Sequence, residues 1–310
     1  MGAAERNFRL SDEFVRAARS VLVDSHDSPK ETAMTAGPAT TVSVHTLDVP
    51  GATLHYEIRG AGPLIVFVGA PMGADAFAPI ADILASTHTV LTTDPRGHQR
   101  SPLDDPEQDS TAALRGADLA ALITHLGAGP AVVFGSSGGA VSALALVQQD
   151  PDLVTTVIAH EPPSIGLLDD RDSLLDGTTD LIETYRGGDT VGAWRKFFAQ
   201  ANIQIPDPLL TQMFGGDRPA QDLASEKYWF EHEIVHTVGW QPDPAVLAAA
   251  PTRVIIGLGA DSAGQLCART CHELARRLGT TPTVFPGGHT GFTEDIPAFA
   301  ARLREVLRTA

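Results

Sequence analysis

The chain has 310 residues, of which 43% are hydrophobic, enough to bury a large core. Its formal net charge is −16, from 22 basic and 38 acidic side chains, and no run of Lys or Arg forms a basic patch. This disfavours nucleic acid and anionic membrane surfaces as partners, because both are bound through clustered positive charge. The N-terminal segment has no apolar signal core, and no apolar run reaches the roughly 18 residues of a membrane-spanning helix, so we expect a cytoplasmic protein.

Residues 1–40 are predicted to form an N-terminal extension. Residues 11–26 have the apolar spacing of one amphipathic helix with Ser11 as its N-cap. The residues that follow, rich in Thr, Ala and Pro, are typical of a linker. Met34 is an alternative start for the native protein, which N-terminal sequencing would test.

From residue 41 onward, short apolar strands alternate with amphipathic helices. Pro50-Gly51 predicts a hairpin between the first two strands. We expect strands over residues 41–49, 52–60, 63–70, 88–94, 130–137, 153–163, 252–261 and 281–289. We expect helices over residues 74–87, 110–127, 138–149, 265–279 and 296–310. This alternation predicts an α/β fold whose sheet is mostly parallel and covered by helices on both faces.

An insertion over residues 165–250 breaks the alternation. It is helix-rich by pattern and contains all three tryptophans, Trp194, Trp229 and Trp240. We therefore predict an α/β core over 41–164 and 251–310, with the insertion as a helical lid above a pocket at the strand ends. The alternative is that the aromatic side chains only fill the insertion's own small core.

The segment FGSSGG, residues 134–139, is typical of a nucleophile elbow, since it ends a predicted strand and begins a predicted helix. A sharp turn forces the serine into a strained backbone conformation, and glycine is needed two residues before and after it. Gly135 and Gly139 meet this need and identify Ser137 as the nucleophile, because Ser136 has Phe at the equivalent position. The N–H of Gly138, at the helix start, is suited to binding an oxyanion.

A serine nucleophile needs a base and a group that orients the base. His289 follows the last predicted strand, and Asp261 follows the strand before it, so both should lie at the same sheet edge as Ser137. We predict His289 as the base and Asp261 as the orienting acid. Glu161, at the end of an earlier strand, is the rival for the acid's role.

The segment HEIVH raises a competing possibility. His232 and His236 have the i, i+4 spacing of a zinc-protease helix, with Glu233 as the potential base. In one branch of zinc proteases a third histidine follows, but that position here is Pro242, which cannot bind zinc. We interpret the segment as an amphipathic helix of the lid. The two cysteines, Cys267 and Cys271, are predicted to be buried thiols on one helix face, since their spacing is typical of neither a zinc knuckle nor a disulfide framework.

Four motifs together resemble the α/β-hydrolase family, in its serine-nucleophile branch, over residues 41–310: GSSGG, DPRGHQRS, GAD and GGHTGF. The resemblance implies an eight-stranded, mostly parallel sheet with an antiparallel second strand and a helical lid inserted after the sixth strand. It also implies a second oxyanion donor in the loop after the third strand, which by position is the N–H of Ala70. That loop lacks the histidine that usually opens it. A serine at position 137 argues against the members that use an aspartate nucleophile.

These observations predict a serine hydrolase that cleaves a small or medium, fairly apolar carboxylic ester through an acyl-enzyme. Enzymes with the same triad cleave carbon–carbon bonds, lactones or thioesters, or act as cofactor-free haloperoxidases, and these are alternatives. An alternative of another class is a non-catalytic protein that binds a ligand in the same fold. We expect no cofactor, no metal and a small-molecule substrate, with activity rising through about pH 6–7 as His289 loses its proton.

Overall fold

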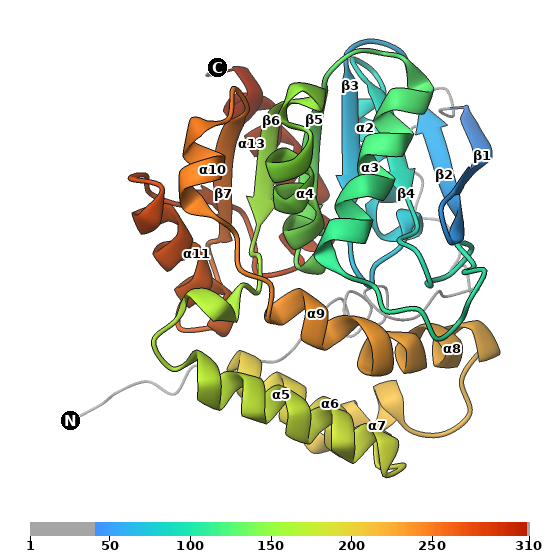
Figure 1. Ribbon diagram of the computed structural model, residues 1–310, viewed down its shortest axis with the longest axis vertical. Helices are drawn as coiled ribbons and strands as arrows, with labels where there is room; N and C mark the ends of the chain where they lie inside the picture. Colours follow the sequence, from blue (N-terminus) through green and yellow to red (C-terminus); the bar gives the residue numbers. More distant parts are fainter. Residues whose placement is uncertain (1–40, 309–310) are drawn as a thin grey trace.

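The computed structural model describes residues 41–308, so the predicted N-terminal helix and linker lie outside the described residues. One sheet of eight strands forms the centre of the molecule (Figure 1). The strands are β1 (Val42–Val49), β2 (Ala52–Arg59), β3 (Leu64–Val68), β4 (Thr89–Thr93), β5 (Ala131–Ser136), β6 (Val154–His160), β7 (Arg253–Gly259) and β8 (Thr283–Phe285). Their order is β1-β2-β4-β3-β5-β6-β7-β8, and β2 is antiparallel to both β1 and β4, whereas the other adjacent strands are parallel. The predicted α/β-hydrolase sheet is confirmed.

Helices cover both faces of the sheet because buried side chains alternate along the central strands. In β5, Val133 packs on one face, whereas Phe134 packs on the other. The first face carries α3 (Ala112–Leu126), α4 (Gly138–Gln149), α10 (Pro244–Ala249) and α11 (Leu266–Arg277). The second carries η1 (Ala74–Phe77), α2 (Ala78–Leu84), α12 (Gly291–Glu294) and α13 (Ile296–Arg308). Two short turns of 3-10 helix flank β6, namely η2 (Pro151–Leu153) and η3 (Ile165–Leu167).

The insertion between β6 and β7 forms a helical layer at one end of the sheet, which we call the cap (Figure 1). Its elements are α5 (Arg171–Arg186), α6 (Thr190–Ala201), α7 (Asp207–Phe214), α8 (Ala220–Tyr228), the π-helical η4 (Trp229–Glu233) and α9 (Ile234–Val238). Trp194 stacks between Phe214 and Trp229, with ring centroids 4.4 and 4.9 Å away. These aromatic side chains therefore fill the cap's own core. Helix α10, which falls within the predicted lid range, instead buries Leu247 against the sheet core.

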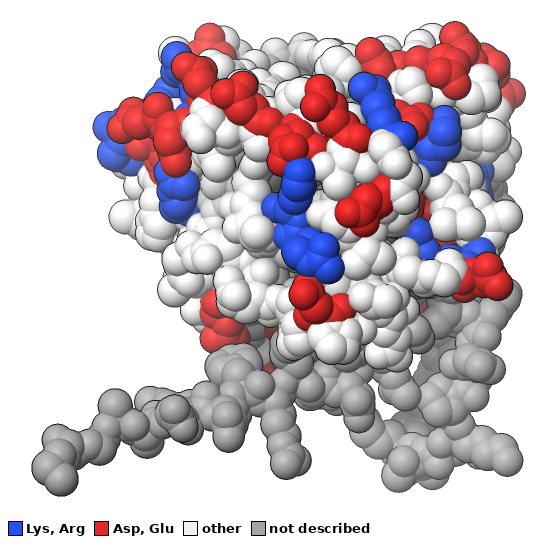
Figure 2. Space-filling model, turned by 90° about the horizontal axis from the view of Figure 1, so that it is seen from below, with Lys and Arg blue, Asp and Glu red and all other residues white. Residues whose placement is uncertain are grey.

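Figure 2 shows the molecule from the end at which the cap lies, and acidic and basic side chains alternate on the visible described surface. Charged side chains pair within the cap, such as Lys196 with Asp180 at 2.6 Å and Arg195 with Asp207 at 2.8 Å. Within residues 41–308, no helix has both the length and the apolar character needed to cross a bilayer.

Candidate active site

Ser137 lies in the sharp turn between β5 and α4. Its φ and ψ angles of 56° and −124° are rare for a residue with a side chain, and such strained residues cluster at functional sites. A Cβ on Gly135 would overlap the carbonyl oxygen of Gly139, and a Cβ on Gly139 would overlap that of Val68. This close approach accounts for glycine at both positions. Ser136, the other serine of the motif, is fully buried at the end of β5, whereas Ser137 is half-buried.

The two predicted oxyanion donors, Ala70 and Gly138, lie in neighbouring backbone segments. Parallel pairing places Val68 of β3 opposite Gly135 of β5, so the loop after β3 meets the elbow at the same sheet edge. A Cβ on Gly138 would lie 2.6 Å from the Ala70 carbonyl oxygen. Gly138 is also the first residue of α4, where N–H groups have no partner within the helix.

His289 follows β8, and its Nδ1 atom lies 2.6 Å from Oε2 of Glu161. The predicted orienting acid, Asp261, is instead exposed in the turn after β7, where its backbone N–H donates to the Gly287 carbonyl. The carboxylate that the structure brings to His289 is therefore that of the rival, Glu161, and not that of Asp261. The reason is the register of the strands: His160 pairs with Gly257, so Glu161 directly follows the paired residues, whereas Asp261 lies well beyond them. In addition, β6 is the strand next to β5, which carries the elbow.

Glu161 is rigidly held at the end of β6. Its φ angle of 54° lies in the left-handed region, like that of Ser137, and its side chain is fully buried. Oε1 accepts a hydrogen bond from the Gly259 N–H at 2.8 Å, which leaves Oε2 for His289. Burial by itself raises the pKa of this carboxyl, but the hydrogen bond and charge of His289 outweigh it and lower the pKa to about 2. Glu161 is therefore an anion at neutral pH.

Cys267, in the first turn of α11, is also beside His289, a contact that the sequence did not indicate. Ligand atoms of Cys267, His289 and Glu161 lie within 4.8 Å of one another. Burial lowers the pKa of His289, but Cys267 and Glu161 more than offset this, and the pKa is raised well above 6.5. The prediction of two buried thiols is correct for Cys271 and wrong for Cys267, which is partly exposed. The two thiols lie on one face of α11, one turn apart, and the first turn, which carries Cys267, is the one beside His289.

The side chains of the segment HEIVH contact residues of the core. His232 Nδ1 lies 3.1 Å from Oδ1 of Asp109, and His236 Nε2 lies 3.2 Å from Oδ2 of the same carboxylate. The glutamate of the motif, Glu233, is buried, and its Oε2 lies 2.9 Å from Nε2 of His98. The three residues therefore attach the cap to the core, in agreement with their interpretation as part of a lid helix.

Glu233 is the centre of a buried polar cluster that joins the cap to the core. Ser110 donates a hydrogen bond to its Oε2 at 3.3 Å, and Nη1 of Arg115 lies 3.7 Å from the same oxygen. Arg115 also donates from Nη2 to Thr237 of the cap at 2.8 Å. Burial raises the pKa of Glu233, but the charges of His98 and Arg115 outweigh it and lower the pKa. The carboxylate is thus held as an anion inside the protein.

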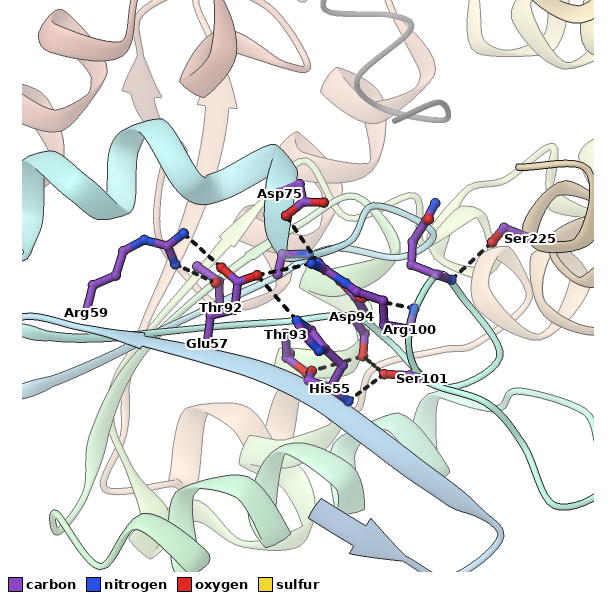
Figure 3. Close-up of polar contacts among 12 residues, drawn as sticks. His55, Glu57, Arg59, Asp75, Thr92, Thr93, Asp94, Arg100, Ser101 and Ser225 are labelled. Carbon is purple, nitrogen blue, oxygen red and sulfur yellow. Dashed lines mark hydrogen bonds and ion pairs between the residues drawn. The ribbon is translucent and has the colours of Figure 1, made fainter. Parts of the chain in front are cut away.

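A second polar network joins the loops that follow β3 and β4 (Figure 3). The buried Asp94, which follows β4, accepts a hydrogen bond from the Ala74 N–H at 2.7 Å. The other oxygen of Asp94 accepts from Nε of Arg100 at 2.7 Å, and Arg100 also reaches Glu57 at 3.2 Å. Asp94 thus ties the loop after β3 to the loop after β4. In the sequence, Asp94 is the first residue of the segment DPRGHQRS, one of the four motifs of the family.

Comparison with known proteins agrees with this architecture. The sequence profile of the alpha/beta hydrolase family matches residues 65–302. The chain is 31% identical over 272 residues to the uncharacterized hydrolase YraK of Bacillus subtilis (strain 168), covering 86% of this chain and 97% of that one. It is 34% identical over 114 residues to 2-(acetamidomethylene)succinate hydrolase of Mesorhizobium japonicum, covering 36% of this chain and 40% of that one. The crystal structure of the enol-lactonase from Burkholderia xenovorans LB400 superposes with a TM-score of 0.61 at 17% identity, covering 85% of this chain and 100% of the other.

Proposed function

The chain belongs to the alpha/beta hydrolase family, and from this premise we propose that it is a serine hydrolase with Ser137, His289 and Glu161 as its triad. The observation that carries the proposal is the 2.6 Å contact between His289 and the buried carboxylate of Glu161. The proposal is further supported by the position of Ser137 after β5, since β5 is the neighbour of β6, whose end carries Glu161. The names of the relatives support hydrolysis as the reaction class.

In the proposed reaction, His289 removes the hydroxyl proton of Ser137 as Oγ attacks the acyl carbonyl. The Glu161 carboxylate accepts a hydrogen bond from Nδ1, which selects the tautomer whose Nε2 is the base and stabilises the imidazolium that forms. The N–H groups of Ala70 and Gly138 bind the tetrahedral oxyanion. His289 then gives its proton to the leaving alkoxide, and water, activated by the same imidazole, cleaves the acyl-enzyme. These steps require no cofactor.

We propose a small or medium, fairly apolar carboxylic ester as the substrate class. The support is a helical cap joined to the core at the end of the sheet where the proposed triad lies. Lactones, thioesters and activated carbon–carbon bonds are cleaved by the same three residues, so a panel of these substrates belongs to the test. Trp194 and Trp229 are buried in the cap's own core, so the proposed substrate class does not rest on them.

The test is intact-mass analysis after exposure to a fluorophosphonate. We expect one adduct on the wild type and none on Ser137→Ala. Ser136→Ala is the matched control, because its hydroxyl is buried at the end of β5 and should not be needed for labelling. An adduct that persists in Ser137→Ala contradicts the proposed nucleophile. A folded wild type that remains unlabelled while binding a ligand without turnover favours a non-catalytic binding protein instead.

A further inference from the structure

Three metal-ligating side chains of different types converge at His289. The thiol of Cys267 comes from α11, the imidazole of His289 from the loop after β8, and the carboxylate of Glu161 from the end of β6. Their ligand atoms all lie within 4.8 Å of one another. Glu161 is fully buried, whereas Cys267 and His289 are partly exposed, so an ion can reach the group from solvent.

This donor set is typical of zinc sites. Zinc binds thiolate sulfur at about 2.3 Å and imidazole nitrogen or carboxylate oxygen at about 2.0–2.2 Å, so tetrahedral ligand atoms lie roughly 3.3–3.7 Å apart. The ligand atoms of the group lie within 4.8 Å of one another, and the 2.6 Å contact between His289 and Glu161 must open to reach that spacing. The thiolate also favours zinc over magnesium or calcium, which prefer oxygen ligands.

We propose that Cys267, His289 and Glu161 bind Zn²⁺ and that the bound ion inhibits the hydrolase. Binding forms metal–sulfur, metal–nitrogen and metal–oxygen bonds, and the protons of the thiol and of the imidazole nitrogen that binds the metal are released to solvent. A metal-bound imidazole cannot act as the base for Ser137, and Glu161 no longer orients it. The inhibitory part rests on the proposed function, whereas the binding part does not.

The histidine pair of the cap is the rival site. His232 and His236 both pair with Asp109, and His232 Nε2 lies 3.9 Å from Glu107. Within residues 41–308, however, three metal-ligating side chains whose ligand atoms lie within 4.8 Å of one another are found at His289 and not at the cap pair. The two sites can be separated by mutation, because they share no residue.

Binding is measured on the metal-free full chain by titration with ZnCl₂ against a chromophoric chelator. We expect one equivalent to bind to the wild type and to Ser137→Ala. Loss of a second-shell group typically weakens metal binding about 10- to 100-fold, so loss of the ligand in Cys267→Ala should cost at least about 100-fold. Cys271→Ala, one turn along the same helix, should bind normally. With Co²⁺ in place of zinc, a thiolate charge-transfer band should appear in the wild type and vanish in Cys267→Ala.

No zinc binding by the wild type, or unchanged binding by Cys267→Ala, overturns the proposal. Binding that is lost in His232→Ala and kept in Cys267→Ala places the ion at the cap pair and also overturns it. Fluorophosphonate labelling tests the inhibition separately. Zinc should slow the labelling of the wild type, and a chelator should restore it. Zinc should not change the labelling rate of Cys267→Ala. If the protein binds zinc but the metal-free protein is not labelled, the proposed hydrolase is rejected and the metal site is retained. If the zinc-loaded protein is labelled as fast as the metal-free protein, the proposed inhibition is rejected.

Discussion

The carboxylate of Glu161 combines a strained backbone, complete burial and two short hydrogen bonds. A residue held in the left-handed region costs on the order of 1–3 kcal/mol, and such strain persists where the surrounding structure imposes it. Here the backbone strain of Glu161 is offset by the hydrogen bonds that its carboxylate forms with the Gly259 N–H and with His289. The carboxylate therefore lies beside His289, at the end of the strand next to β5. Substitution of Glu161 therefore tests directly whether its carboxylate orients His289.

Replacing Glu161 with glutamine should remove most of the activity. The amide keeps the volume but does not stabilise the imidazolium or select the tautomer, and the equivalent change in a Ser-His-Asp protease lowers kcat by about 10⁴-fold. We expect a fall of similar size in kcat for Glu161→Gln. Asp261→Asn, the matched control on the exposed turn after β7, should leave kcat nearly unchanged. The opposite pattern in steady-state kinetics would restore Asp261 as the orienting acid.

The raised pKa of His289 predicts a shifted pH profile. The base must be neutral, and a higher pKa keeps the imidazole protonated to higher pH, so activity is lost over a wider acidic range. The rising limb of kcat/KM should therefore lie above the ordinary histidine pKa of 6.5, and above the range expected from sequence. Cys267→Ala should move the limb toward lower pH, since the thiol is one cause of the shift. A wild-type limb at or below 6.5 would be incompatible with this account.

The sequence predicted the sharp turn at Ser137 and the glycines that flank it, because the elbow is a local motif. It also placed Asp261, His289 and Glu161 together at one sheet edge, because each follows a predicted parallel strand. It could not choose between the two acids, since that choice depends on how far each residue lies beyond the last strand pair. The neighbours of Cys267 were hidden for a similar reason: helical spacing does not show which turn faces the site.

At the scale of elements, the polar cluster around Glu233 determines how the cap meets the core. The carboxylate is contacted from the loop after β4 by His98 and from the start of α3 by Ser110 and Arg115. The histidine spacing of its segment suggested a metal helix, but the side chains pair with acids from loops far away in sequence. Such partners are set by tertiary packing, which the local pattern does not encode.

Removing the Glu233 carboxylate should destabilise the protein strongly. Breaking a buried ion pair by removing one partner typically costs about 3–5 kcal/mol, because the other charge is left uncompensated. We expect a loss of that order for Glu233→Ala in urea unfolding. Glu231→Ala is the matched control in the same helix, since its pair with Lys227 is at the surface and such pairs contribute about 0.3–0.5 kcal/mol. Similar losses for both variants would show that the cluster contributes little.

At the scale of the whole molecule, the contacts between cap and core predict one cooperative unit. Besides Glu233, the backbone N–H of Ser110 donates to the His232 carbonyl at 2.9 Å, and the Tyr228 hydroxyl donates to the Gln108 carbonyl at 2.9 Å. The cap also shares its apolar core with Leu266 of α11. A cap attached through both polar and apolar contacts should not unfold while the sheet remains folded.

Tryptophan fluorescence can test this, because Trp194 and Trp229 are both in the cap core and Trp240 lies just beyond α9. Fluorescence therefore reports mainly on the cap, whereas far-ultraviolet circular dichroism reports on all helices and strands. We expect the two urea transitions of the wild type to coincide, as a two-state protein requires. In Glu233→Ala the fluorescence transition should move to lower urea than the circular dichroism transition, since the mutation weakens the attachment of the cap. Separate transitions already in the wild type would show that cap and core are independent units.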